Sequence, residues 1–332
     1  MENGKRLDVI QVMRFFCAVC IFVYHSELVG NHGYFGVEMF CIISGFLMMY
    51  TTQTKEARKF FMRKRIFRIV PLYWLLTIFT YCIIWQLPQL SVRSEAKPEY
   101  LIKSLFFIPF ENGFGFTDPI LSVGWTLNYE MLFYIVFFVA IHISHKYRGA
   151  IACGIIVALV LVGYGMHPSD AVLKFYTDSF LLEFAFGIAV YYMVKAVDRG
   201  VMNIGRYKAL LSGIALFFLL WLLVNPLSDS QIPRCVRIGV PAMVFVIVIL
   251  LLYRERTFSK RFVELGNLSF SFYLIEYFAS AGCRILVERF GTPLQLCILM
   301  VIFVITVLCS YVTYWVVELR FTNWLKGHFC VR

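Results

Sequence analysis

The segment MRFFCAVCIFVYHSELVG, residues 13–30, resembles a membrane-spanning helix, yet Arg14 stands near its start and His25 toward its end. Along a helix, eleven residues turn by about 1100°, which is ~20° more than three full circles, and rise by roughly 16 Å. The two side chains therefore share one face. Because ionisable groups within lipid usually face protein or a wet cavity, this face predicts a functional stripe. The alternative is an arginine that extends toward the inner membrane surface and a histidine that is satisfied within the core.

Composition indicates a membrane protein. Of 332 residues, 60% are hydrophobic and 18% aromatic, which is more apolar surface than a soluble core of this size can bury. We therefore predict an all-α integral membrane protein, a bundle of about ten transmembrane helices in a single domain over residues 1–332, with no separate soluble domain. The predicted spans approach the roughly 20 residues that cross a ~30 Å hydrocarbon core, and they cover residues 7–28, 35–51, 66–86, 121–143, 149–166, 177–195, 208–225, 237–253, 266–287 and 294–317.

The distribution of charge predicts the orientation. If the N-terminus is cytoplasmic, 22 of the 31 Lys and Arg residues fall in inner segments and eight in outer segments. Membrane proteins concentrate basic residues on the cytoplasmic side, so we expect both termini to be cytoplasmic. This asymmetry accounts for the net charge of +11 without a nucleic-acid partner.

Three acidic residues are predicted to lie at the depth of His25. Glu130 enters the span 121–143 from outside by about two turns, and Glu38 and Glu183 enter their spans from the same side. A carboxylate at that depth could orient His25 and raise its basicity. The alternative is that each acid caps a helix start, where negative charge is favoured.

A dense basic run precedes the third predicted span. Seven basic residues lie within residues 55–68, and Arg65 and Arg68 share a helix face at a spacing of three residues. Arginine forks beside a membrane can bind phosphates tightly. Topology anchoring, or binding of anionic lipid head groups, explains the same run. This segment therefore predicts an anion site without identifying the anion.

Glycine and proline residues add local expectations. Gly45, which follows Ser44 in the second span, predicts close backbone approach or a broken helix. Pro71 and Pro241 suit first-turn positions of their helices. The longest outer loop, residues 87–120, either covers a site and faces an acceptor or is an ordinary loop.

Five stretches together resemble the acyltransferase-three family of multi-pass membrane acyltransferases, relatives of bacterial O-antigen and exopolysaccharide O-acetylases. The resemblance runs from about residue 6 to 277 in family order and rests on RLDVIQVMRFFCAVCIFVYH, GYFGVEMFCIISGFLM, FMRKRIFRIVPLYW, WTLNYEMLFY and LGNLSFSFYLIEY. It implies a bundle of about ten helices that passes an acyl group from cytoplasmic acetyl-CoA, or another acyl-CoA, to a sugar hydroxyl outside, in a bacterial inner membrane.

The resemblance also assigns residues. The family's arginine and histidine of the first span fall on Arg14 and His25, and its basic pair falls on Arg65 and Arg68. Its tryptophan motif begins at Trp125 and ends at Glu130. Glu276 stands where relatives often have histidine, which puts a second histidine role in doubt. The chain ends about 15 residues beyond its last predicted span, so we expect no esterase-like domain.

These assignments give one mechanism. The phosphates of acyl-CoA bind Arg63, Lys64, Arg65 and Arg68, the pantetheine arm passes Arg14, and His25, oriented by Glu130 or Glu38, removes a proton from the acceptor hydroxyl. A covalent acyl-histidine step is the alternative. We expect Trp125, Glu183 and Glu276 to contact the substrate, a saccharide or lipid-linked glycan. No metal or tightly bound cofactor is expected, and membrane lipids are the remaining partners.

Two other function classes fit the same residues. In a transporter or flippase, Arg14, His25 and the acids would line a path for an anionic or glycolipid substrate. A membrane sensor or scaffold would show no turnover. The inverted repeats common in transporters are not evident in the sequence.

Overall fold

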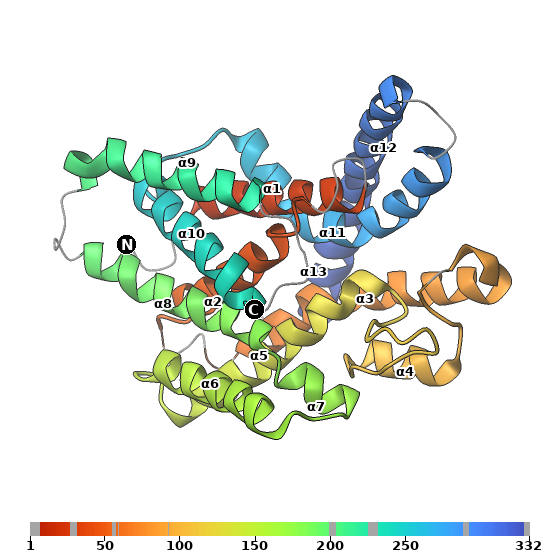
Figure 1. Ribbon diagram of the computed structural model, residues 1–332, viewed down its shortest axis with the longest axis horizontal. Coiled ribbons are helices and arrows are strands. Elements are labelled where there is room, and N and C mark those ends of the chain that lie inside the picture. The colour runs from red at the N-terminus through yellow and green to blue at the C-terminus, as the bar shows by residue number, and fades with distance from the viewer. Residues whose placement is uncertain are drawn as a thin grey trace. The chain divides into compact units, whose positions relative to one another are not determined.

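A computed structural model describes residues 7–26, 32–54, 58, 60–91, 93–198, 204–224, 232–287 and 292–328, and every regular element within these ranges is helical (Figure 1). Segments η7 and η8 are π-helical, and the other η segments are 3₁₀ turns. In chain order the elements are α1 (Asp8–His25), α2 (Gly36–Thr51), α3 (Phe61–Gln86), η2 (Pro88–Leu90), α4 (Pro98–Leu105), η3 (Ser122–Gly124), α5 (Trp125–Ile143), α6 (Arg148–Met166), α7 (Ala171–Tyr176), η4 (Ser179–Leu181), α8 (Leu182–Ala196), η6 (Ile204–Tyr207), α9 (Lys208–Val224), η7 (Cys235–Gly239), α10 (Val240–Tyr253), α11 (Lys260–Val287), α12 (Thr292–Thr313), η8 (Tyr314–Phe321) and α13 (Thr322–His328).

The all-α prediction is confirmed for the described residues, because each of the ten predicted spans coincides with a helix. Among the described residues, eight helical stretches are long and apolar enough to cross a membrane. Of the two others, α2 has 16 residues, and α11 interleaves Asn267, Ser269 and Glu276 with its apolar residues. The chain is thus a multi-pass membrane protein, whereas the total of ten spans and the cytoplasmic termini stay predictions.

Helix α3 begins earlier than predicted, and its proline corrects an expectation. The basic residues before residue 66 continue the helix back to Phe61, so Pro71 lies inside α3 and not in its first turn. Pro71 lacks the N–H that would bond the carbonyl of Phe67 four residues earlier. The hydroxyl of Thr322 lies 3.3 Å from that carbonyl and can donate to it. Pro241 does occupy the first turn of α10, as predicted.

The chain divides into two compact units, and each is described by itself. The first unit comprises Met1–Ala57, Leu182–Phe270 and Gly282–Leu299, and the second comprises Arg58–Leu181, Ser271–Ala281 and Met300–Arg332. The prediction of a single domain concerns the whole chain and stays a prediction.

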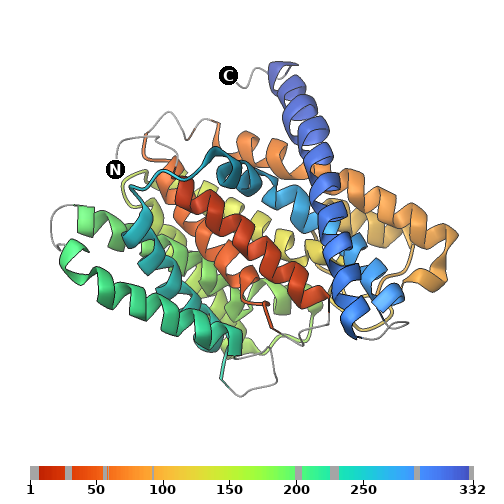
Figure 2. The ribbon, with the colours of Figure 1, turned by 90° about the horizontal axis from the view of Figure 1, so that it is seen from above.

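The first unit is organised around the crossing of α2 and α8. A Cβ atom added to Gly187 of α8 would lie 2.9 Å from the Cα atom of Gly45 in α2, and one added to Gly45 would overlap the backbone of Phe184. Small residues allow helix backbones in a membrane to approach this closely. The predicted close approach at Gly45 is therefore confirmed. Helices α1 and α10 also pack on α2, and α9 lies along α10 (Figure 2).

In the second unit, α3 packs against α5, which forms a hairpin with α6. The ring of Phe61 lies 5.4 Å from that of Phe137. The connection after α3 folds back on the same helix, since Tyr73 donates to the Ser104 carbonyl at 3.1 Å and Trp74 to the Leu105 carbonyl at 2.8 Å. The connection between α3 and α5, which was predicted to be an outer loop, is thus anchored to α3 through the end of α4.

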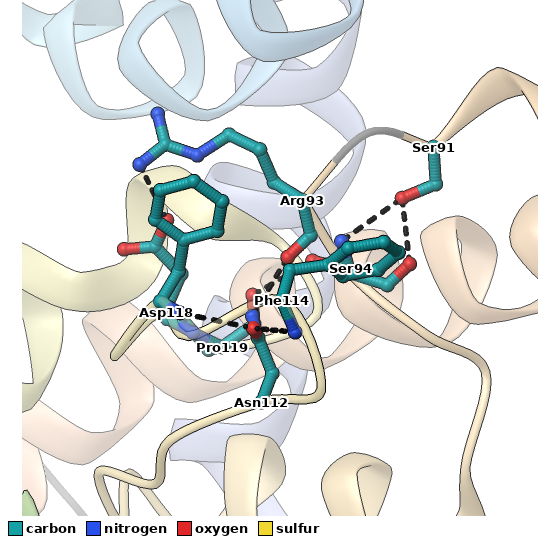
Figure 3. Close-up of polar contacts among 8 residues, drawn as sticks. Ser91, Arg93, Ser94, Asn112, Phe114, Asp118 and Pro119 are labelled. Carbon is teal, nitrogen blue, oxygen red and sulfur yellow. Dashed lines mark hydrogen bonds and ion pairs between the residues drawn. The ribbon is translucent and has the colours of Figure 1, made fainter.

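The rest of that loop is held by two polar side chains (Figure 3). Asn112 donates to the Arg93 carbonyl at 2.7 Å and accepts from the backbone of Phe114 and Phe116. Arg93 pairs with Asp118 at 3.0 Å and lies over the Phe116 ring. Burial raises the pKa of Asp118 above its ordinary value, against the lowering effect of Arg93. The loop is therefore a structured element.

Candidate functional site

Helix α1 carries the two residues of the predicted stripe. It runs without interruption from Asp8 to His25, so the helical geometry that places Arg14 and His25 on one face holds. Arg14 is 8% exposed and lies within the protein interior. His25 is half-buried at the end of the helix, with its ring 5.1 Å from that of Tyr24. The stripe thus joins a buried cation to an imidazole at the helix end.

A buried ion pair lies in the first unit. Glu38, in the first turn of α2, is fully buried, and Arg234 donates from Nε to its Oε1 at 2.6 Å. The guanidinium of Arg234 also lies 4.3 Å from the centroid of the Tyr34 ring, which meets Tyr24 edge-on at 4.9 Å. These aromatic contacts place the Glu38–Arg234 pair toward the end of α1 that carries His25.

Glu183 lies beside this pair. It is fully buried in the first turn of α8, within electrostatic reach of Glu38 and Arg234. Its carboxylate occupies the space next to Gly239, the last residue of η7. Neither oxygen accepts a hydrogen bond from the described residues, so no backbone bond supports the capping alternative for Glu183. Glu38 and Glu183, which were predicted to lie at the depth of His25, thus lie near each other within the first unit, and the polar pocket that includes His25 and Glu130 stays a prediction.

The second unit contains a separate polar cluster on α3 and α5. Tyr134 donates from its hydroxyl to Oε1 of Glu130, one turn earlier on α5. The guanidinium of Arg65 lies 5.7 Å from the Tyr134 ring centroid and 5.8 Å from that of Phe61. Arg65 is also within electrostatic reach of Glu130 and Arg68. The predicted phosphate-binding arginine and the predicted orienting acid thus meet at one tyrosine.

The other predicted residues occupy different environments. Arg63 and Lys64 are exposed on the first turn of α3, and Arg68 is half-buried. Trp125 packs between the rings of Tyr129 and Phe180, at 6.0 Å and 5.3 Å. Glu276 is fully buried in α11. The predicted contact between His25 and Glu130 joins the two units and stays a prediction.

Three residues of these clusters were not predicted from the sequence: Tyr34, Tyr134 and Arg234. Arg234 and Glu38 lie 196 positions apart, so no local spacing indicates their pairing. A usable signal exists, because Arg234 and Arg237 are two of the eight basic residues assigned to outer segments, on the side where Glu38 and Glu183 enter their spans. Within the ranges described, no group of three His, Cys, Asp or Glu side chains is placed to hold a metal ion.

Comparison with known proteins gives consistent matches. Residues 7–315 match the acyltransferase domain family. The exopolysaccharide production protein ExoZ of Rhizobium meliloti (strain 1021) is 31% identical over 269 residues, which cover 77% of this chain and 81% of the relative. The putative acetyltransferase ORF330 of Acidianus two-tailed virus is 23% identical over 248 residues, which cover 73% and 72%. No solved structure matches the chain.

Proposed function

Because the chain belongs to the acyltransferase domain family, we propose that it transfers an acyl group, by default acetyl, from cytoplasmic acyl-CoA to a hydroxyl group of an extracytoplasmic saccharide. The names of two relatives, one a protein of exopolysaccharide production and one a putative acetyltransferase, support the acceptor and the acyl group. The location we propose is a bacterial inner membrane.

The observation that carries this proposal is the arrangement on α1. One unbroken helix holds a buried arginine and, eleven residues later, a half-buried histidine. A buried guanidinium in a membrane helix is costly unless it serves a polar path or partner. We propose that Arg14 lines the path of the acyl group and that His25 lies where this path ends.

The donor is bound by the basic turn of α3. Arg63 and Lys64 present exposed charges, and Arg68 is half-buried one turn farther on. Arg65 is held over two aromatic rings, which fixes the direction of its fork. The set thus offers the phosphates of CoA two exposed basic side chains and one arginine whose guanidinium direction is fixed.

The chemistry at His25 is a single acyl transfer. The imidazole removes the proton of the acceptor hydroxyl, and the alkoxide attacks the thioester carbonyl carbon. The C–O bond forms as the C–S bond breaks, and the CoA thiolate takes the proton back from the imidazolium. Glu38 or Glu130 orients the imidazole, while Trp125 and Glu276 contact the substrate. The thioester supplies the driving force.

Two measurements test the function together. Purified protein in nanodiscs should release free CoA thiol from acetyl-CoA when surface glycan from gene-deleted cells is added as the acceptor. Surface glycan from cells with the gene should carry an ester, seen by NMR, that cells without the gene lack. Movement of a glycolipid without thiol release would favour a transporter and contradict the proposal. Absence of both the thiol release and the ester would also contradict it.

A further inference from the structure

Glu183 is the most unusual side chain of the first unit. Its exposed fraction is 0%, and neither carboxylate oxygen has a hydrogen-bond donor or ion-pair partner among the described residues. An ionised carboxylate offers about four acceptor sites, and burying it without donors is strongly unfavourable. Glu183 is therefore a strong hydrogen-bond acceptor to which no described residue donates.

The surrounding backbone makes room for this carboxylate. A Cβ atom on Gly239 would overlap Oε1 and would lie 2.7 Å from Cδ of Glu183, so only glycine leaves this space. Gly239 ends the π-helical segment η7, and such segments occur frequently at functional sites. The local backbone thus leaves space for the carboxylate but supplies no hydrogen-bond donor to it.

The neighbouring charges restrict what can bind. Glu38 is already paired with Arg234, although its Oε2 accepts no hydrogen bond from the described residues. An anionic group placed against Glu183 would be repelled by its carboxylate, since Arg234 is already paired with Glu38, and Arg237 is the other cation within electrostatic reach of Glu38. No described group of three side chains suits a metal. A neutral ligand that donates hydrogen bonds satisfies Glu183 and leaves the Glu38–Arg234 pair intact.

The ion pair links the buried acids to an exposed edge of the protein. The Arg234 side chain is 25% exposed, while its partner Glu38 is 0% exposed. Tyr34 lies under the Arg234 guanidinium, so an aromatic face, which favours apolar contacts, lies beside the pair.

We propose that Glu183, Gly239 and the Glu38–Arg234 pair form the acceptor subsite, and that Glu183 binds a vicinal diol of an uncharged sugar through both oxygens. Two adjacent hydroxyl groups supply the two donors that the carboxylate lacks. Arg234 completes the subsite by holding Glu38 and contacting the ring of Tyr34. This proposal rests on the proposed acyl transfer and names the class of its acceptor.

Two variants test the subsite in different ways. Glu183→Gln removes the charge with little change of shape, and Gly239→Ala displaces the carboxylate without changing any charge. Gly154→Ala is the matched control, because a Cβ there meets no atom within 4 Å. Each variant is expressed in gene-deleted cells, surface-glycan ester is measured by NMR, and acetyl-CoA affinity is measured by calorimetry on the purified protein.

In both test variants we expect the amount of surface-glycan ester to fall at least tenfold, while the Kd for acetyl-CoA stays within twofold of wild type. The control should retain the wild-type amount of ester. The wild-type ester should lie on an uncharged sugar that bears two free adjacent hydroxyls in the unmodified glycan. A normal ester level in Glu183→Gln, a parallel loss of acetyl-CoA affinity, or an ester on a uronic acid would overturn the subsite. A wild-type strain without a gene-dependent ester would instead contradict the proposed function.

Discussion

The Arg65 guanidinium lies over the Tyr134 ring, 5.7 Å from its centroid. The hydroxyl of the same tyrosine donates to Glu130, so one buried side chain contacts both a cation of α3 and an acid of α5. The basic turn that we assign to the donor is therefore coupled to the acid of the tryptophan motif. Changes at Tyr134 should affect both groups, although Tyr134 need not touch either substrate.

Tyr134→Phe removes the hydroxyl and keeps the ring. A hydrogen bond to a charged group contributes about 1.5–3 kcal/mol, so we expect kcat/KM for acetyl-CoA to fall about tenfold or more. Tyr134→Leu also removes the ring under Arg65, so its KM for acetyl-CoA should be higher than that of Tyr134→Phe. Steady-state thiol release measures both variants, with exposed Tyr147→Phe as the control. If Tyr134→Phe and wild type had the same kcat/KM, the hydrogen bond from the Tyr134 hydroxyl to Glu130 would have no part in donor use.

The basic turn of α3 should determine donor affinity more than turnover. The double variant Arg65→Ala/Arg68→Ala should raise the Kd for acetyl-CoA more than it lowers turnover at saturation. The exposed pair Arg63→Ala/Lys64→Ala should have a smaller effect, which high salt should reduce. Calorimetry at two salt concentrations checks this. Unchanged affinity in the first double variant would return the cluster to the role of a topology anchor.

The α2–α8 crossing should not tolerate even a methyl group. Gly187→Ala places a Cβ against the backbone of Ile42 and Gly45, so we expect a loss of about 1–3 kcal/mol in unfolding free energy. Gly154→Ala has open space at its Cβ and should stabilise its helix by about 0.5–1 kcal/mol. Thermal unfolding of the purified proteins compares them. A neutral Gly187→Ala would show that the helices can separate at no cost.

Asp118 should make the loop between α3 and α5 sensitive to pH. Burial raises the pKa of Asp118, so the folded loop binds this proton more tightly than the unfolded chain does. The stability of the loop should therefore fall as pH rises from the ordinary aspartate range through the raised value. Asp118→Asn should remove this dependence without weakening the loop at pH 7. Hydrogen exchange of residues 112–120 in both proteins, compared at each pH, measures it. Weaker protection in the Asn variant at pH 7 would show that the Arg93 pair dominates.

The lengths of the apolar runs predicted the helices, and single residues within them predicted part of the packing. Apolar runs coincide with helices because each run must satisfy its own backbone in lipid. Gly45 was recognisable as a position of close backbone approach or of a broken helix, and the structure shows the close approach. Glu38 and Glu183 were assigned a similar depth because both enter their spans from the same side.

Pairings across long sequence separations were not predictable in this way. Arg234 joins Glu38 from a segment 196 positions away, and Thr322 lies near the carbonyl left unbonded by Pro71. The start of α3 at Phe61 was missed because span length alone set its boundary at residue 66, although the basic turn is helical as well. Hydropathy carries no information about which polar side chains meet.

The central claim is that His25 is the base at the end of the α1 stripe, and its most direct test is acetyl transfer by His25→Ala. Thiol release and glycan esterification should fall at least ~100-fold, the lower range for loss of a general base, while the protein keeps its membrane insertion and its acetyl-CoA affinity. His142→Ala, an exposed histidine on α5, should keep wild-type rates. Near-normal turnover by a folded His25→Ala protein would contradict the account.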